Sequence, residues 1–405
     1  MAETGLDPWY KNQSHALVIG LVALLGTYGE TAIGMLPMMV TGWIESGGLD
    51  EATAGYLGSA TLGGMTLGLA AAVLLIKRHN HAWVARVGVI IALGADLASA
   101  GITAPLVLGM VRVCAGIGYG LVVATIVNWF ARHPAADRCF GAFMLLQLLV
   151  FATLFVLVRY LTTWLGSIAG FACLFVLGAC CLTIVPLLNT QREMHPEKRT
   201  EAQGAVRPLA LCWQLSVVLA PAVLLVAMVG FWAYLSQLGI AMGIDADHVA
   251  QALGAVTLTG VPATLGVIWL GDRWGRQRPI WLGIAGLLMP IGLFWMGPTG
   301  LVSFLIGGAL FNMAWSFIIP SMQAVQADLD RTGRLAALST IPQAIGAAIG
   351  PAAFALALGF GRFPAGFAMA VVFVVVSLMM MQIPASLADT APPVAQPAPG
   401  QLASE

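Results

Sequence analysis

Three ionisable residues stand inside long apolar stretches of this 405-residue sequence: Glu30, Asp96 and Arg112. A charged side chain in such surroundings is costly, so each is a candidate for function. Glu30 can carry a proton or bind a cationic substrate, and its alternative role is a hydrogen bond that holds two helices together. Arg112 keeps its charge in any protein, so it needs water, a carboxylate or an anionic substrate beside it. Asp96 lies at a similar depth and is the candidate partner, in a structural ion pair or in a proton relay.

Uncharged polar and aromatic residues inside the apolar stretches are candidates for a binding cavity, where apolar walls carry a few hydrogen-bonding groups. Gln147 and Gln343 occupy matching places in the two halves of the chain and are the strongest candidates. Helix packing is the alternative role for each of these side chains. The residues expected at the cavity are Tyr28, Gln147, Trp232, Tyr234, Gln237, Asn312, Trp315 and Gln343.

Other kinds of chemistry have little support in the sequence. It contains no phosphate-binding loop for ATP and no arrangement typical of a hydrolase, so we expect neither an enzyme nor a cofactor. The six Cys lie in apolar stretches without a Cys-x-x-Cys pair, which indicates small buried side chains. Met35 and Met39 have a spacing that could present two thioethers to Cu(I). No His or Cys lies near them in the sequence, and we expect no metal site.

Long apolar segments must position these residues. Hydrophobic residues make up 59% of the chain and charged residues only 9%, far below the roughly 25% charged residues of a soluble domain. A helix needs about 20 apolar residues to cross a bilayer. Twelve segments qualify: residues 15–41, 52–76, 82–103, 105–130, 139–160, 164–188, 213–241, 248–271, 279–297, 299–324, 335–358 and 363–384. We expect an all-α integral membrane protein with twelve transmembrane helices.

The positions of Lys and Arg predict the orientation. With the N-terminus in the cytoplasm, 15 of the 18 Lys and Arg residues fall on the cytoplasmic side, as the positive-inside rule requires. Both termini of this multi-pass protein are therefore expected in the cytoplasm, and the membrane is expected to be a bacterial inner membrane. The net charge of zero gives no sign of a nucleic-acid partner. The expected partners are the lipid bilayer, protons and a small organic substrate, and the protein is expected to be a monomer.

The chain also contains an internal repeat. Arg138 and Gln147 recur as Arg334 and Gln343, at an offset of 196 residues. Two similar halves predict pseudo-symmetric six-helix bundles with a substrate site between them and alternating access to it. The expected parts are the first bundle (residues 1–188), a cytoplasmic linker (189–208), the second bundle (209–384) and a disordered cytoplasmic tail (385–405).

Three motifs resemble those of the major facilitator superfamily. The segment Asp272-Arg273-Trp274-Gly275-Arg276 is similar to its Asp-Arg-x-Gly-Arg loop. The segment Arg112-Val113-Cys114-Ala115-Gly116-Ile117-Gly118 resembles its Arg-x-x-x-Gly-x-Gly pattern. Gly26-Thr27, Glu30 and Gly34-Met35-Leu36-Pro37 resemble the first helix of its proton-driven drug and sugar exporters. The resemblance implies a secondary transporter in which Arg112 contributes to proton coupling and Asp272, Arg273, Gly275 and Arg276 form a conformational-switch loop.

One departure from the family pattern bears on the direction of transport. The fifth segment lacks the Gly-Pro signature of antiporters, and a Gly-Pro pair lies instead in the eleventh segment, between Gly346 and Pro351. We therefore expect a secondary active transporter of a small organic solute, coupled to protons through Glu30, Asp96 and Arg112. The alternatives are a proton-antiport exporter of amphipathic compounds, a facilitator without ion coupling, and a non-transporting sensor or assembly factor with a transporter fold.

Overall fold

The computed structural model describes residues 8–45, 47–133, 136–191, 210–270, 273–296, 300–330 and 334–390. All regular structure within these residues is helical. The first half has α1 (Pro8–Gly34), α2 (Leu36–Glu45), α3 (Glu51–Leu75), α4 (His81–Ser99), α5 (Pro105–Ala131), α6 (Ala136–Leu165) and α7 (Ala169–Ile184), with 3₁₀ helices at Gly166–Ile168 and Val185–Gln191. The second half has α8 (Leu211–Ala233), α9 (Leu235–Ala241), α10 (Ala246–Leu258), α11 (Gly260–Leu270), α12 (Gln277–Trp295), α13 (Leu301–Leu329) and α14 (Arg334–Asp389).

Eleven helical segments in the described part of the chain are long and apolar enough to cross a membrane. The last of them, α14, has 56 residues and leaves the helical conformation at Gly361 and Arg362. Counted as two helices, α14 brings the number of segments to the twelve that the sequence predicts. The pairs α1–α2, α8–α9 and α10–α11 each correspond to one predicted segment with an interruption.

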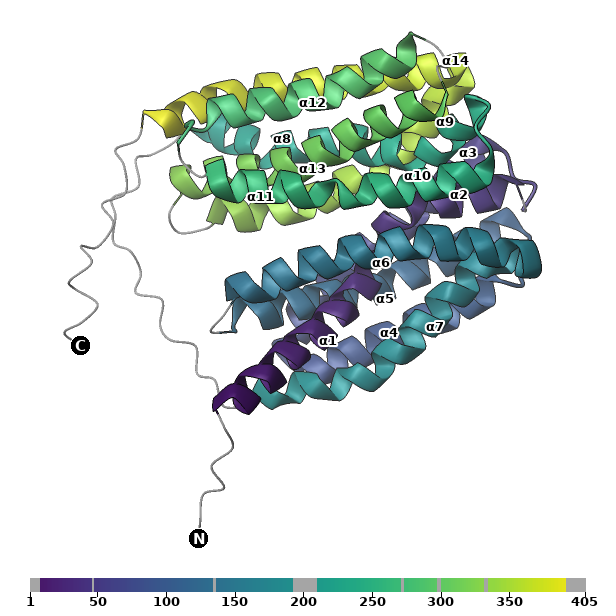
Figure 1. The fold of residues 1–405 in the computed structure, drawn as a ribbon. Coiled ribbons are helices and arrows are strands. Elements are labelled where there is room, and N and C mark those ends of the chain that lie inside the picture. Colours follow the sequence, from purple (N-terminus) through teal and green to yellow (C-terminus); the bar gives the residue numbers. More distant parts are fainter. Residues whose placement is uncertain are drawn as a thin grey trace, which may run out of the picture.

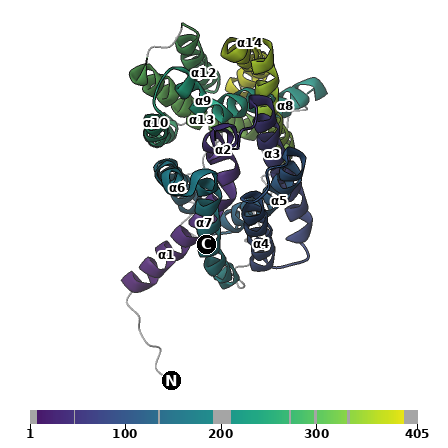
Figure 2. The same ribbon diagram turned by 90° about the vertical axis from the view of Figure 1, so that its right-hand side faces the viewer.

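The helices form two bundles that correspond to the two halves of the chain. Figure 1 shows α1 and α4 to α7 in one group and α8 to α14 in the other, with α2 and α3 where the groups meet (Figure 2). α3 packs against both α5 and α14, and α6 packs against α10. The start of α1 and the end of α14 lie at one end of the molecule, here called the proximal end. The connection between α2 and α3 lies at the opposite, distal end.

Close packing around α5 depends on two of its glycines. A Cβ on Gly116 would lie 1.9 Å from the carbonyl oxygen of Thr61 in α3, and a Cβ on Gly118 would lie 2.5 Å from that of Gly88 in α4. No side chain fits at either place, so these glycines let the backbones of α3 and α4 approach α5 directly. This approach allows Arg112, on the same helix, to reach side chains of both neighbours.

The last helix extends further than the sequence predicts. α14 continues to Asp389, although the composition predicts a disordered tail from residue 385. Asp389 accepts hydrogen bonds from the backbone N–H groups of Arg276 and Gln277, between α11 and α12, and these bonds fix the end of the helix. The predicted linker 189–208 lies outside the described residues except for its first three positions, 189–191.

Candidate functional site

Asp96 and Arg112 form an ion pair in the core of the first half. Arg112 Nη1 donates a hydrogen bond to Asp96 Oδ1 at 2.7 Å, and the Tyr119 hydroxyl donates to Asp96 Oδ2 at 2.6 Å. Arg112 Nε also donates to the Thr61 hydroxyl at 3.3 Å. Both charged side chains are completely buried. The partnership that their equal depth suggested is therefore present in the structure.

One hydrogen-bond donor of this ion pair lacks an acceptor among the described residues. Arg112 Nη2 is buried and has no partner among the described residues. The Phe171 ring faces the guanidinium, with its centroid 5.7 Å from Cζ, and this contact supplies no oxygen acceptor. The groups that contact the pair come from α3, α4, α5 and α7, so the pair lies inside the first bundle rather than between the bundles.

Tyr28 belongs to this buried cluster. Its ring packs edge-on against Tyr119, with 5.3 Å between the centroids, and its side chain is fully buried. Successive residues of a helix are rotated by about 100°, so Tyr28 and Glu30 point to nearly opposite sides of α1. In this structure Tyr28 therefore lies away from Glu30, and its role at a substrate cavity stays a prediction.

Glu30 lies about one turn before the end of α1, on the side that faces α6. The glycines one turn before and after it pack against two phenylalanines of α6: Gly26 against Phe143, and Gly34 against Phe151. This register places Glu30 level with Gln147, which lies midway between the two phenylalanines. Glu30 is half-buried, and its carboxylate forms no hydrogen bond or ion pair with the residues that the structure describes. The carboxylate is thus accessible to a proton or a solute.

A proline in α2 frees the acceptor that joins the two halves. Pro37 has no N–H, so the carbonyl of Ile33, four residues earlier, lacks its usual helical partner. This oxygen accepts a hydrogen bond of 3.0 Å from Nε1 of Trp232 in α8. Ile33 lies one turn beyond Glu30 toward the distal end and on the same side of α1. The halves therefore meet one helical turn away from Glu30.

Among the described residues, three further polar contacts join the halves, all toward the distal end. They are the Tyr234 hydroxyl to the Glu51 carbonyl at 2.6 Å, the Ala352 N–H to the Ser59 hydroxyl at 2.9 Å, and the ion pair between Arg159 and Asp247. Tyr234, a predicted cavity residue, is 1% exposed and serves instead to close the distal end. Trp232 has the same role, and its ring also packs against Phe155 of α6.

Asn312 has a structural role that its sequence position does not reveal. Its side-chain amide donates to the carbonyl oxygens of Val256 and Thr257, each at 3.0 Å. These carbonyls precede the interruption between α10 and α11, where Pro262 lacks an N–H to continue the helix. Asn312 therefore stabilises the interrupted helix.

The other predicted cavity residues lie in the second half and make few polar contacts. Gln343 donates to the Ser339 hydroxyl at 2.9 Å, and Trp315 packs edge-on against Phe311. Gln237 Nε2 is buried without a partner among the described residues. Gln343 and Trp315 are half-buried, so they retain surface that a solute can contact.

The predicted switch loop is only partly described, because Asp272 lies outside the described residues. Gly275 has a φ of +69°, which favours glycine. Arg276 forms an ion pair with Asp328 at the end of α13, and its backbone N–H is bound by Asp389. Arg273 is exposed. The loop thus ties α13 and α14 together at the proximal end of the second half.

The methionines considered for a metal lie near a cysteine in space. Met35, Met39 and Cys173 line a small cavity of about 30 Å³ with apolar neighbours, so distance along the sequence was a poor guide to their surroundings. Among the described residues, no three His, Cys, Asp or Glu side chains are placed to hold a metal ion.

The sequence interpretation missed several residues of the site. Tyr119 was detectable, because it lies seven residues after Arg112 and hence on the same side of α5. The role of Ile33 was detectable too, because Pro37 lies four residues later and has no N–H to bind the Ile33 carbonyl. Arg159 and Asp247 gave no such signal, because their pairing depends on how the two halves meet.

Comparison with known proteins identifies the family. The sequence matches the model of the Major Facilitator Superfamily over residues 17–351, and no curated protein matches it closely enough to count as a relative. Similar solved structures include the nucleoside transporter NupG, with 14% identity, a TM-score of 0.67 and coverage of 93% of this chain and 99% of that one.

Two further solved structures have a similar fold. The inward-open xylose transporter XylE from E. coli has 16% identity and a TM-score of 0.68, covering 91% of this chain and 95% of that one. A POT family transporter in complex with 5-aminolevulinic acid has 12% identity and a TM-score of 0.70, covering 92% and 96%. These structural similarities show the fold, and the match to the family model shows the family. The chain belongs to the major facilitator superfamily and is a membrane transporter, not an enzyme.

Proposed function

We propose that this protein is a proton-coupled secondary transporter that moves a small organic solute by alternating access. Glu30 is the proton carrier, and the neighbouring Gln147 binds the solute, together with Gln343 from the second half. Asp96 and Arg112 modulate the coupling from inside the first bundle. The observation that carries the proposal is Glu30 itself. A half-buried carboxylate without a partner is energetically unfavourable inside a membrane helix, so its presence there indicates a function.

The proposed orientation puts the distal end outside the cell. Lys and Arg are concentrated at the proximal end of the helices, which the positive-inside rule assigns to the cytoplasm. Both termini are then cytoplasmic, in a bacterial inner membrane. The contacts that join the halves at the distal end support an inward-facing state of a transporter that we propose is a monomer, and an inward-open structure of XylE is among its structural neighbours.

Uptake of a polar organic solute is the direction we favour. Neighbours of the fold include a D-xylose-proton symporter and the nucleoside transporter NupG, and the antiporter signature is absent from α6. The amide groups of Gln147 and Gln343 suit a solute that carries several hydroxyl or carbonyl groups.

The test begins with a thermal-shift screen of purified protein against pentoses, nucleosides, dipeptides and 5-aminolevulinic acid. Uptake of the stabilising compounds into proteoliposomes is then measured with and without an imposed pH gradient. We expect accumulation that depends on the gradient, and we expect Glu30→Gln to abolish accumulation while exchange of solute at equal pH continues.

Glu51→Gln is the matched control, because Glu51 is an exposed carboxylate at the distal end of α3 that lies outside the proposed site. This control should transport like the natural protein. Undiminished accumulation by Glu30→Gln would exclude Glu30 as the proton carrier. Equal flux with and without the gradient would identify a facilitator, and binding of a protein partner without any flux would favour a sensor.

A further inference from the structure

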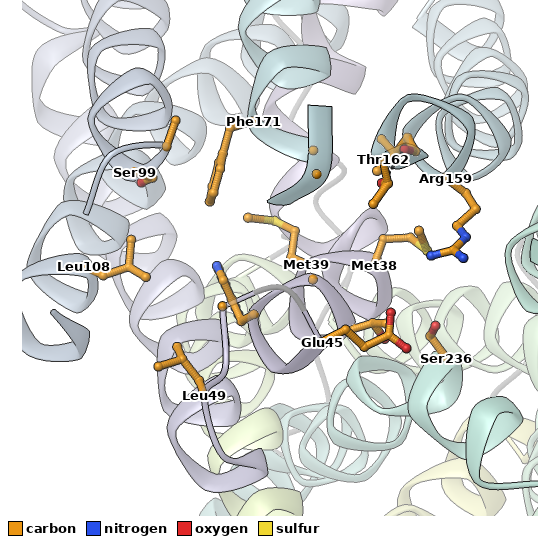
Figure 3. A pocket seen from close by; sticks show the side chains of 18 of the residues that line it. Met38, Met39, Glu45, Leu49, Ser99, Leu108, Arg159, Thr162, Phe171 and Ser236 are labelled. Carbon is orange, nitrogen blue, oxygen red and sulfur yellow. Dashed lines mark hydrogen bonds between the residues drawn. The ribbon is translucent and has the colours of Figure 1, made fainter. Parts of the chain in front are cut away.

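A cavity of about 190 Å³ opens at the distal end of the first bundle. We call it the distal vestibule and define it by Thr41, Gly42, Ser99, Arg159 and Phe171. Figure 3 shows Ser99 and Phe171 on one side of it and Arg159, Glu45 and Ser236 on the other. Glu45 and Thr103 in its wall are exposed, so the vestibule meets the solution at this end.

The inner side of the vestibule lies against the buried ion pair. Ser99 is one turn beyond Asp96 on α4, and Leu108, another lining residue, is one turn before Arg112 on α5. Phe171 both lines the vestibule and faces the Arg112 guanidinium. One aromatic ring therefore separates the vestibule from the charge.

The vestibule has the polarity and the size that buried water requires. Thr41 is 6% exposed, and its hydroxyl lacks a partner among the described residues. Arg112 Nη2, behind the Phe171 ring, lacks one too. Unpaired buried groups of this kind are normally hydrated, and the volume accommodates about six waters at about 30 Å³ each.

We propose that the distal vestibule is a water-filled passage that connects the Asp96–Arg112 pair with the distal solution while the two halves are closed there. The contacts that close the halves do not block it, because its walls come almost entirely from the first half, with only Ser236 and Ala246 from the second. A hydronium ion in the passage can transfer its proton to the Asp96 carboxylate, and Arg112 keeps its charge. Only this proton-entry role rests on the proposed function; the passage itself rests on the cavity.

Hydroxyl-radical footprinting of the natural protein in lipid nanodiscs tests the passage, because the radicals form from water. Met38 and Met39 line the vestibule, whereas Met289 and Met379 are 59% and 69% exposed on the outer faces of their helices, where lipid excludes water. We expect Met39 to oxidise at least tenfold faster than Met379. Equal rates would overturn the proposal, because they would mean that the cavity is dry.

A plug tests the route itself. A Cβ on Gly42 or on Gly94 meets no atom within 4 Å, but only Gly42 lines the vestibule, so Gly42→Phe fills it and Gly94→Phe is the matched control. In a variant without native cysteines, we measure how fast Ser99→Cys reacts with 2-sulfonatoethyl methanethiosulfonate added at the distal side of sealed vesicles.

We expect a measurable reaction that Gly42→Phe slows at least tenfold and Gly94→Phe leaves within twofold. An unreactive thiol, or one that the plug does not slow, would show that the route is closed or lies elsewhere. These readouts need no transported solute. Transport without proton coupling would therefore refute the proposed function and leave the passage intact. A dry vestibule would refute the passage and leave the proposed function intact.

Discussion

At the scale of single residues, the proposed function rests on two carboxylates in different surroundings. Glu30 has no partner among the described residues and faces α6 at the level of Gln147. Asp96 accepts hydrogen bonds from Arg112 and Tyr119 and is completely buried. A carboxylate without a partner can change its protonation at little structural cost, whereas a paired one must first give up an ion pair. This difference supports the proposal that Glu30 is the carrier and that Asp96 modulates the coupling from inside the first bundle.

The Asp96–Arg112 pair yields a prediction about stability. Asp96→Asn leaves Arg112 charged and unpaired in the core, which should cost about 3–5 kcal/mol. Arg112→Gln should cost a similar amount for the converse reason. The double variant removes both charges and should recover much of the loss. Thermal unfolding in detergent measures all three.

The same double variant separates the two roles of the pair. If Asp96 takes part in coupling, the doubly substituted protein should fold yet respond less to an imposed pH gradient. A double variant with an unchanged gradient response would leave the pair with a structural role alone.

At the scale of helices, close contacts hold the buried pair together. Gly116→Ala would place a methyl group 1.9 Å from the Thr61 carbonyl, so α3 must move away from α5. Such overpacking costs about 1–3 kcal/mol and should weaken the bond from Arg112 to Thr61. Gly94→Ala is the control, because its methyl group meets no atom within 4 Å and alanine favours a helix. A loss of thermal stability no greater for Gly116→Ala than for Gly94→Ala would contradict this account.

The start of α3 should respond to acid. Asp50 caps this helix, and the bond from the Thr53 backbone N–H holds the pKa of its carboxyl below the usual value of 3.8. Because the pKa is lowered in the folded protein, the cap stabilises the helix at neutral pH and loses this effect as the pH falls below 3.8 and through the lowered pKa. The protection of the Thr53 amide against hydrogen exchange should therefore fall in acid, relative to that of amides in the middle of α3.

Asp50→Asn should remove this response, since an asparagine cap does not titrate in this range. The change matters for closure because the carbonyl of the next residue, Glu51, accepts the Tyr234 hydroxyl. If Asp50→Asn showed the same acid response at Thr53, a titratable group other than Asp50 would be its cause.

The sequence predicts helices better than it predicts contacts between them. The twelve segments follow from apolar length, and the depth of Asp96 and Arg112 follows from counting residues within a segment. The packing of Tyr28 against Tyr119 was not predicted, because nearness to Glu30 in sequence does not mean the same side of a helix. The bonds of Asn312 were not predicted, because its partners are backbone carbonyls on α10, which no side-chain pattern marks. Trp232 and Tyr234 proved to close the distal end, and that role depends on how the bundles meet.

At the scale of the whole molecule, the distal contacts determine which end is closed. Arg159 and Asp247 form an ion pair across the two halves and are partly exposed, at 27% and 55%. An exposed pair contributes at most about 1 kcal/mol, enough to shift a balanced equilibrium severalfold. Asp247→Arg should therefore favour opening at this end, and exchanging the two residues should restore closure.

Distances between spin labels at Thr103→Cys and Met296→Cys report this equilibrium, because both positions are exposed near the distal end of opposite halves. The label distance should lengthen in Asp247→Arg and return in the exchanged variant. High salt should reduce the difference, since it screens exposed charges. Identical distance distributions in all variants would show that the apolar contacts alone keep the distal end closed.

The neutrality of the Asp96–Arg112 pair has an electrical consequence. Moving one elementary charge through 100 mV of membrane potential is worth about 2.3 kcal/mol, but a pair that moves as a unit carries no net charge. Rocking of the first bundle with this pair intact therefore does no work against the membrane potential. As long as Asp96 stays ionised, the voltage dependence of solute-evoked currents reports only the proposed carrier Glu30, its proton and the charge of the solute. A current–voltage curve can thus count the charges that cross the membrane in each transport cycle.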